Sequence, residues 1–296
     1  VLGLERFVTW QRLFNRQYDQ PLSRPEHVRR ALEALGPTFI KLGQILSTRA
    51  DLLPLRYQVE LAKLQDAAPP LPSGVIKEIV AAELGQPVET AFRTFDETPL
   101  AAASIGQVHG ATLPDGTRVV VKVQRPGVAE QIEQDLQIME NLATTARRRW
   151  ALMDQYDVVG VVNEFGQTLR AETNYLREGH NADRVRANFI DDETVHVPMV
   201  FWEMTTPRVL TLERLGGIKI DDVDGLERAG LNRSAVALEG ARMVLKMIFK
   251  DGFFLACPHP GNFFIDPSCR IGVVEFRMVG TVSPRMQEQL VWALIA

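Results

Sequence analysis

Leu255-Ala-Cys257-Pro-His259-Pro-Gly-Asn262, with Glu275-Phe276-Arg277 downstream, is the stretch of the sequence that decides the fold. His259 lies between two prolines, which is typical of a turn. A further turn, Asp266-Pro267, and an apolar run with the character of a strand separate the two parts of the stretch. The sequence therefore predicts two groups of polar residues on loops that flank a short strand.

The spacing of these residues resembles that of the active site of protein kinases. In those enzymes a catalytic Asp precedes a metal-binding Asn by five positions, and an Asp-Phe-Gly segment further along supplies a second metal ligand. Here Asn262 follows Cys257 at that spacing, while Glu275 and Arg277 stand where the Asp and the Gly are expected. The stretch predicts a nucleotide site with altered chemistry, and it leaves open whether the site still turns nucleotide over.

Composition limits the classes of protein that this chain can represent. With 296 residues, of which 46% are hydrophobic and 24% charged, the chain can bury a large core and is expected to fold. A net charge of -4 and a pI near 5.8 give no electrostatic basis for general nucleic-acid binding. Two cysteines are too few for a disulfide framework and fit a reducing compartment.

The sequence offers no candidate membrane span, because it lacks an uninterrupted apolar run of about 18 residues. The chain begins at Val1 instead of Met and stops inside the apolar run 290–296. We expect both ends to be fragment boundaries, so that any anchor or targeting signal would lie outside this sequence.

Residues 1–90 are expected to form a helical extension. Apolar residues recur at spacings of three and four in 28–35 and again from Thr38, with Gly36-Pro37 between the two helices. In the second helix Lys41 and Gln44 lie on about one face, and a polar stripe of this kind usually faces solvent.

A proline-rich linker, Pro69–Pro72, then leads to a helix over 73–84. We expect Ser73 to be its N-cap and Gly85 to end it.

Residues 91–215 are predicted to form a lobe built on β-hairpins, with a Pro114-Asp115-Gly116 turn. Lys122 lies in the β-branched run 118–123, where its amine must either reach solvent or meet an anion. Ala101–Ser104 stands where a kinase carries a Gly-rich loop. Alanine still allows close backbone approach, although it disfavours a positive φ.

Two helices, over 128–150 and 158–189, are expected to follow the hairpins. Glu172 and Glu178 lie six positions apart in the second, so at most one of them can readily pair with Lys122. Strands around 196–198 and 208–211 are predicted to complete a small sheet.

The segment Leu212–Gly217, which contains Glu213, is predicted to be a hinge between two lobes. A helix over 234–249 then leads to the stretch quoted first. Residues 216–296 would form a partial second lobe.

Several motifs in order give the chain a specific resemblance to the UbiB family, also called the ABC1 or ADCK atypical kinases. The motifs are Lys41-Leu-Gly-Gln44, Ala101-Ala-Ala-Ser-Ile-Gly-Gln107, Val120-Val-Lys122-Val-Gln-Arg-Pro-Gly127, the segment 172–181, Pro258-His-Pro-Gly-Asn262 and Glu275-Phe276. The resemblance implies an α+β, two-lobed protein-kinase-like fold whose N-terminal helical extension packs over the active site. It also implies binding of ATP or ADP with Mg²⁺.

The resemblance further implies a role in the synthesis of ubiquinone or another prenyl-quinone, or in lipid homeostasis. The implied partners are lipid or prenyl-quinone precursors, quinone-biosynthesis proteins and a membrane surface. The implied location is the cytoplasmic side of a membrane, with peripheral attachment or anchoring by segments outside this sequence.

The resemblance also assigns roles to individual residues. Lys122 would hold the α- and β-phosphates, paired with Glu178 or Glu172, and position 257 would be catalytic. Asn262 and Glu275 would bind the metal. The nucleotide would be contacted by Ala101, Ala102, Ala103, Ser104, Lys41, Gln44 and Glu213.

Three substitutions depart from the family pattern at chemically important positions. The thiol of Cys257 cannot replace an Asp unless it ionises, and neighbouring acids and phosphates oppose that. Glu275 keeps the charge of an Asp but is one methylene longer, which displaces a ligand in a site that demands octahedral geometry. Arg277 could pair with Glu275 or reach a phosphate.

Two hypotheses follow from these substitutions. The chain could be a slowed ATPase or small-molecule phosphotransferase. Alternatively, it could be a pseudokinase that acts as a nucleotide-dependent scaffold.

Overall fold

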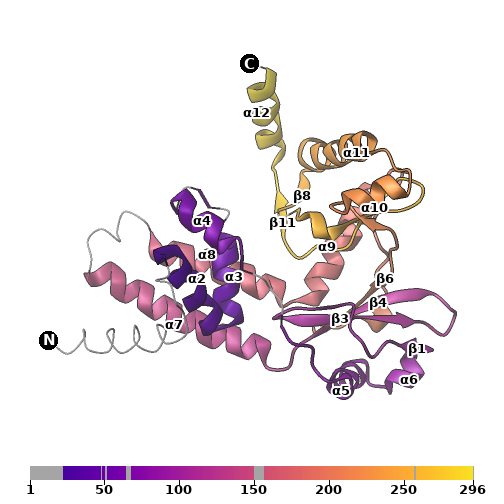
Figure 1. The fold of residues 1–296 in the computed structure, drawn as a ribbon, viewed down its shortest axis with the longest axis horizontal. Coiled ribbons are helices and arrows are strands. Elements are labelled where there is room, and N and C mark those ends of the chain that lie inside the picture. Colours follow the sequence, from indigo (N-terminus) through magenta and orange to yellow (C-terminus); the bar gives the residue numbers. More distant parts are fainter. Residues whose placement is uncertain are drawn as a thin grey trace. The chain divides into compact units, whose positions relative to one another are not determined.

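The computed structural model describes residues 23–47, 49–50, 52–64, 68–149, 157–256 and 258–295 (Figure 1). The chain divides into two compact units, Val1–Asp66 and Ala67–Ala296. Helices and sheets both contribute to the described residues, which confirms the predicted α+β class. None of the described helices is long and apolar enough to cross a membrane.

Three helices make up the described part of the first unit: α2 (Arg24–Leu35), α3 (Pro37–Ser47) and α4 (Leu55–Leu61). Ser23 begins α2 with a capping box, in which its backbone N–H donates to Oε2 of Glu26 over 2.7 Å. The predicted break between α2 and α3 at Gly36-Pro37 is confirmed. Gly43 leaves no room for a Cβ beside Leu32 and Leu64, so α3 approaches its neighbours closely at this residue.

The second unit contains a five-stranded antiparallel sheet with the order β1-β3-β4-β6, in which β2 pairs with β3. The strands are β1 (Thr94–Phe95), β2 (Ala101–Ala102), β3 (Gly106–Thr112), β4 (Arg118–Gln124) and β6 (Val209–Glu213). The predicted hairpin is therefore confirmed, with Gly106 opposite Gln124 and Thr112 opposite Arg118.

The alternation of side chains along β4 decides which way Lys122 points. Val119, Val121 and Val123 are fully buried on one face. They pack with α5 (Ser73–Leu84), α6 (Val88–Ala91) and the residues around Phe92. Because side chains alternate, Lys122 lies on the opposite face of the sheet.

Helix α5 ends as predicted and begins differently. Gly85 terminates it in the left-handed conformation, with a φ of 68°. The prediction that Ser73 caps α5 is wrong, because Ser73 is the first helical residue and Pro72 holds the extended N-cap position. Although α5 lies inside the predicted extension 1–90, it packs on the sheet of the second unit.

Helices α7 (Val128–Arg149) and α8 (Val158–Glu172) pack along each other (Figure 1). Arg170 bridges the two helices by donating to both carboxylate oxygens of Glu133 over 2.7 and 2.8 Å. The prediction of one helix over 158–189 is wrong. The chain breaks at Thr173-Asn174 and continues as α9 (Tyr175–Asn188). Asn174 is extended there and accepts from the backbone N–H of Arg177 over 3.2 Å, so it caps a new helix.

The C-terminal part of the unit has a four-stranded sheet, a two-stranded sheet and several helices. The first sheet has the order β5-β10-β9-β7 and comprises β5 (Val195–His196), β10 (Ile271–Val273), β9 (Phe263–Ile265) and β7 (Ile218–Lys219). The second pairs β8 (Phe253–Leu255) with β11 (Val279–Thr281). The prediction that the strand near 196 joins the hairpin sheet is wrong, because β5 pairs in parallel with β10.

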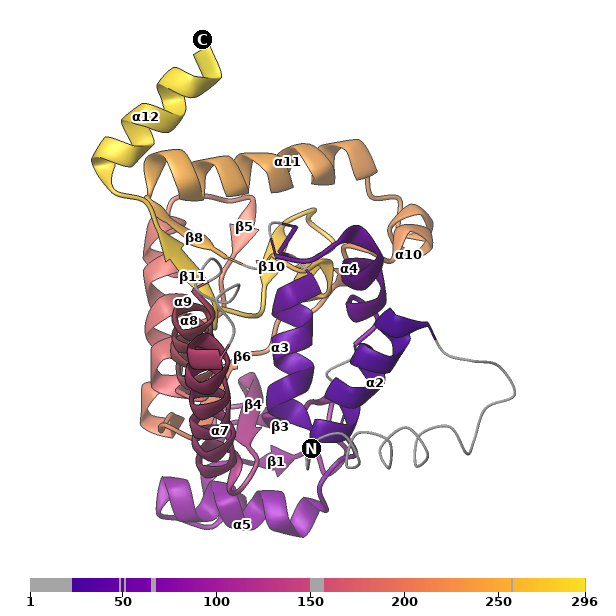
Figure 2. The same cartoon turned by 90° about the vertical axis from the view of Figure 1, so that its left-hand side faces the viewer.

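The helices of this part are α10 (Val223–Arg228), α11 (Arg233–Leu245) and α12 (Pro284–Ile295), with 3-10 turns η3 (Trp202–Met204) and η5 (Pro260–Asn262). Helix α11 runs past β10 (Figure 2) and continues as a π-helical turn, η4 (Lys246–Lys250). The predicted helix over 234–249 is thus confirmed, with a change of winding in its last turn.

Substitution of Asn174 tests the cap that starts α9. Asn174→Ala should lower the free energy of unfolding by about 1 kcal/mol, because the Arg177 amide loses its side-chain acceptor. Asn174→Ser keeps an acceptor and should remain within about 0.5 kcal/mol of wild type. Urea unfolding of the three proteins measures the difference. An alanine variant as stable as wild type would show that the cap does not fix this break.

Candidate functional site

Of the predicted site residues of the second unit that the structure describes, Ala102, Ser104 and Glu172 do not line the pocket of about 450 Å³, and seven others do. They come from the hairpin sheet, from α9, from the 3-10 turn η5 and from the loop after β10. Among the lining residues are Ala101, Ala103, Lys122, Glu178, Glu213, Asn262 and Glu275. Residues that lie up to 174 positions apart in the chain therefore share one cavity.

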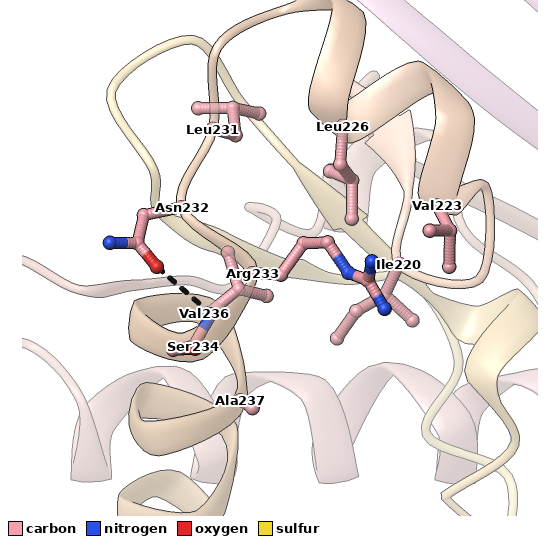
Figure 3. Close-up of a pocket in the computed structure, with 9 residues that line it drawn as sticks. All are labelled: Ile220, Val223, Leu226, Leu231, Asn232, Arg233, Ser234, Val236 and Ala237. Carbon is pink, nitrogen blue, oxygen red and sulfur yellow. Dashed lines mark hydrogen bonds between the residues drawn. The ribbon is translucent and has the colours of Figure 1, made fainter.

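A larger pocket, of about 630 Å³, lies between α10 and the start of α11 (Figure 3). Its lining is mostly apolar, and its one charged residue, Arg233, is paired with Glu227 at 2.7 Å. Asn232 caps α11 by accepting from the backbone N–H of Ser234 over 3.0 Å, as drawn in Figure 3. No predicted site residue lines this pocket, so size alone does not identify the functional site.

Lys122 meets an anion in the smaller pocket. It lies on β4 between Val108 and Leu210 of the neighbouring strands, and its Nζ donates to Oε1 of Glu178 over 2.6 Å. The lysine side chain is 13% exposed and the glutamate 1%, so the pair is largely shielded from water. Nζ also donates to the carbonyl of Val274 over 3.0 Å, which fixes the amine at the pocket wall.

Glu178 and Asn181 on α9 hold the segment Glu275–Arg277 in place. The backbone N–H of Phe276 donates to Oε1 of Glu178 over 3.4 Å, and Nδ2 of Asn181 donates to the Phe276 carbonyl over 2.9 Å. The Phe276 ring is fully buried in the main hydrophobic core. The backbone from which the side chains of Glu275 and Arg277 extend is therefore held in place at the pocket.

Of the two glutamates predicted as alternatives, Glu178 is the partner of Lys122. Glu172 is also buried, but it is the last residue of α8, whereas Glu178 lies in the first turn of α9. Because a helix break separates Glu172 from Glu178, the six-residue spacing within one helix, on which the prediction relied, does not determine where their side chains point.

Arg277 pairs with Glu275 instead of pointing away from the pocket. Nε donates to Oε1 of Glu275 over 2.9 Å, and Nη2 lies at 2.9 Å from the same oxygen. Burial acts to lower the pKa of Arg277, but the carboxylates of Glu275, Glu178 and Glu172 raise it further, and the net effect is an increase. The guanidinium is therefore a permanent cation surrounded by acids.

The turn η5 brings Asn262 to the pocket. The backbone N–H of Asn262 donates to the carbonyl of His259 over 2.9 Å, and Nδ1 of His259 accepts from the Gly261 N–H over 3.0 Å. The Val274 N–H donates to the Asn262 carbonyl over 3.1 Å. Val274 thus joins the loop of Asn262 to Lys122, a link through the main chain that no side-chain pattern signals. Cys257 lies outside the described residues.

Residues Ala101–Ala103 form a short, hydrogen-bonded loop at the edge of the pocket. β2 pairs Ala101 with Val108 and Ala102 with Gln107, and the Ala103 N–H donates to the Gly106 carbonyl over 2.9 Å. Nε of Arg125 holds the Ala103 carbonyl over 2.8 Å.

None of these alanines has a positive φ, so the conformation does not need glycine. Ser104 follows as a buried residue.

Lys41 and Gln44 lie on α3 of the first unit. Nε2 of Gln44 donates to the Leu64 carbonyl over 3.1 Å, which ties α3 to the end of the α4 segment. Their role toward a nucleotide stays a prediction.

The charge of the pocket includes residues that the sequence did not single out. Among the described residues, four cationic and three acidic side chains line it. Arg214 and Lys219 are the two unforeseen cations, and their position beside the predicted hinge was the available signal. The lining is therefore positive overall, which suits an anionic ligand.

The residues present do not fit a resident magnesium ion. Mg²⁺ prefers oxygen ligands and usually takes one or two carboxylates in addition to phosphate oxygens. Of the two predicted ligands, Asn262 supplies a neutral oxygen, and the carboxylate of Glu275 is engaged by Arg277. The described residues also contain no group of three or more His, Cys, Asp or Glu that could hold a metal ion.

Residues 63–296 match the model of the ABC1 atypical kinase-like domain. The chain belongs to the ABC1 family. The resemblance drawn from the sequence motifs and the kinase-like fold are both confirmed.

Two relatives of this chain are longer than it is. It is 42% identical over 284 residues to a "Probable protein kinase UbiB" of Marinobacter nauticus, which covers 94% of the chain and 52% of the relative. It is 41% identical over 263 residues to "Protein ACTIVITY OF BC1 COMPLEX KINASE 7, chloroplastic" of Arabidopsis thaliana, covering 89% and 38%. The chain thus spans about half or less of the length of these relatives.

A solved structure agrees with this assignment. The fold matches Rv3197 of Mycobacterium tuberculosis, solved as a complex with erythromycin, with a TM-score of 0.59 and 28% identity. The match covers 95% of this chain and 68% of the other. The match therefore extends along nearly the whole of this sequence.

A double-mutant cycle tests the pair at the centre of the ABC1 pocket. Glu178→Gln should lower the free energy of unfolding by about 3 kcal/mol, because Lys122 is left with a shielded, uncompensated charge. Lys122→Met with Glu178→Gln should cost less than the sum of the single variants, because no charge is left alone. Urea unfolding provides the energies.

The exposed pair Arg170–Glu133 is the matched control for this cycle. Glu133→Gln should change the stability by less than about 1 kcal/mol. Additive effects of the Lys122 and Glu178 substitutions would contradict the assigned pairing.

Proposed function

We propose that this chain is the nucleotide-binding part of a UbiB-type atypical kinase-like protein, with ATP or ADP in the pocket of about 450 Å³. The observation that carries the proposal is the Lys122–Glu178 pair on the wall of the pocket that Asn262 also lines. The ion pair with glutamate keeps the lysine amine in the pocket, where it can donate charge-assisted hydrogen bonds to a phosphate. Family membership supports the same assignment.

The rest of the pocket suits the other parts of a nucleotide. Val108, Val120 and Phe264 supply apolar surface for a purine, next to the predicted hinge at Glu213. Ala101 and Ala103 form the edge under which the phosphates would pass, where small side chains allow close backbone approach. Magnesium, when a kinase-like protein binds it, neutralises phosphate charge. Because Asn262 and Glu275 do not fit a magnesium ion, we assign magnesium no role in this pocket.

We further propose that turnover is impaired, so that nucleotide occupancy serves mainly to set a conformation. The supporting observations are the thiol at position 257 and the engagement of Glu275 by Arg277. The second candidate is a slowed ATPase or small-molecule phosphotransferase. It is favoured by the intact Lys122–Glu178 pair and by the presence of Asn262 in the same pocket.

The biological setting is proposed from the relatives alone. The name of the UbiB relative and the family resemblance support a role in ubiquinone or other prenyl-quinone synthesis, or in lipid homeostasis. The partners would then be lipid or prenyl-quinone precursors and proteins of quinone synthesis, at the cytoplasmic side of a membrane.

ATP turnover by the purified chain, compared with Cys257→Asp plus Glu275→Asp, separates the two candidates. We expect the wild-type rate to be about a hundredfold lower than that of the double variant, the size of a missing general base. Colorimetric phosphate release measures both rates. Measurable hydrolysis of ATP by the wild-type chain at the rate of the double variant would contradict impaired turnover and favour the enzyme.

Nucleotide binding is measured in parallel by thermal unfolding with ATP or ADP. At about a hundred times its dissociation constant, ligand should add roughly 2.7 kcal/mol of stability. Lys122→Met is the control and should lose most of this gain. If neither nucleotide stabilises the wild-type chain in any buffer, the proposed function is wrong.

A further inference from the structure

Arg277 lines the pocket in contact with Glu275, which the sequence predicted to bind the metal. Its guanidinium lines the pocket together with Lys122, Asn262 and Glu275. Only 20% of the side chain is exposed, and one edge of the guanidinium faces Oε1 of Glu275 at 2.9 Å. A guanidinium carries five N–H donors, so contact with one carboxylate oxygen leaves donors for a second anion.

The backbone around Arg277 fixes the position of this cation. Phe276 is fully buried, and its N–H and carbonyl are held by Glu178 and Asn181 on α9. Arg277 is therefore attached to a rigid anchor, and less rotamer freedom is lost when its fork meets a phosphate. A guanidinium can bind phosphate by two parallel charge-assisted hydrogen bonds, each roughly twice as strong as a hydrogen bond between neutral groups.

The charge balance of the pocket depends on this residue. Four cationic side chains face three acidic ones among the described lining residues, and Arg277 is the cation that lies against Glu275. Without it, the positive and negative charges would be equal in number. A divalent ion at Glu275 would in turn have to displace a guanidinium that carries the same sign of charge.

We infer that Arg277 takes the place of the divalent cation in this pocket, so that the nucleotide's phosphates bind between Lys122 and Arg277 without Mg²⁺. The inference rests on the proposed function, because it concerns the same pocket and the same ligand. It explains the two substitutions together: a longer acid at 275 reaches the guanidinium, and the arginine at 277 supplies the charge. The ligand class is a nucleoside di- or triphosphate in its metal-free form.

Calorimetric titration of ADP into the purified chain, once with EDTA and once with Mg²⁺, tests the inference. The wild-type dissociation constant should agree between the two buffers within about threefold. Arg277→Gly should bind ADP about tenfold or more weakly in EDTA, the size of a lost charge-assisted hydrogen bond. Mg²⁺ should then strengthen binding to this variant, because Glu275 is released.

Two further variants keep the result interpretable. Arg277→Lys retains the charge and should keep binding in EDTA within about threefold to tenfold of wild type. Arg270→Gln breaks another arginine–carboxylate pair, with Asp266 at 2.7 Å, on the turn between β9 and β10 and outside the pocket lining. It should bind ADP like wild type in both buffers.

Each outcome bears on a different claim. Wild-type binding that appears only with Mg²⁺, or an Arg277→Gly variant that equals a folded wild type in EDTA, overturns the inference alone. Absence of binding of both ADP and ATP in the two buffers overturns the proposed function as well. Circular dichroism of every variant shows whether it is folded.

Discussion

The hydrogen-bonded ion pair between Lys122 and Glu178 is the interaction on which the order of the pocket depends. It joins the centre of the hairpin sheet to the first turn of α9, and the same oxygen of Glu178 accepts from the backbone of Phe276. Burying two charges costs much of what their attraction returns, so the pair is better understood as a device that fixes geometry than as a source of stability. Without the Lys122–Glu178 pair, β4, α9 and the Glu275–Arg277 segment would lose their common contact.

Part of this arrangement could be predicted from the sequence because it depends on local rules. Strand alternation put Lys122 opposite the buried valines, and the Pro114-Asp115-Gly116 turn set the hairpin. Gly85 ended α5 as predicted. The order of the motifs identified the family, since several weak signals in sequence are jointly specific.

Other features could not be predicted, because tertiary contacts decide them. The helical pattern runs through Thr173-Asn174, yet Asn174 favours a cap over a helix interior, and the break separates Glu172 from Glu178. The sequence left Arg277 between two partners, and only the fold brings its guanidinium to Glu275. The bond from Lys122 to the Val274 carbonyl involves the main chain and has no residue-type signal.

Lys122 and Arg277 both line the pocket, and we propose that they bind the phosphates of the nucleotide together. A crystal structure of the chain with ADP, grown in EDTA, tests it most directly. We predict phosphate oxygens within about 3.2 Å of both Lys122 Nζ and the Arg277 guanidinium, with the Lys122–Glu178 contact retained. Phosphates bound away from both cations, or Lys122 released from Glu178, would contradict it.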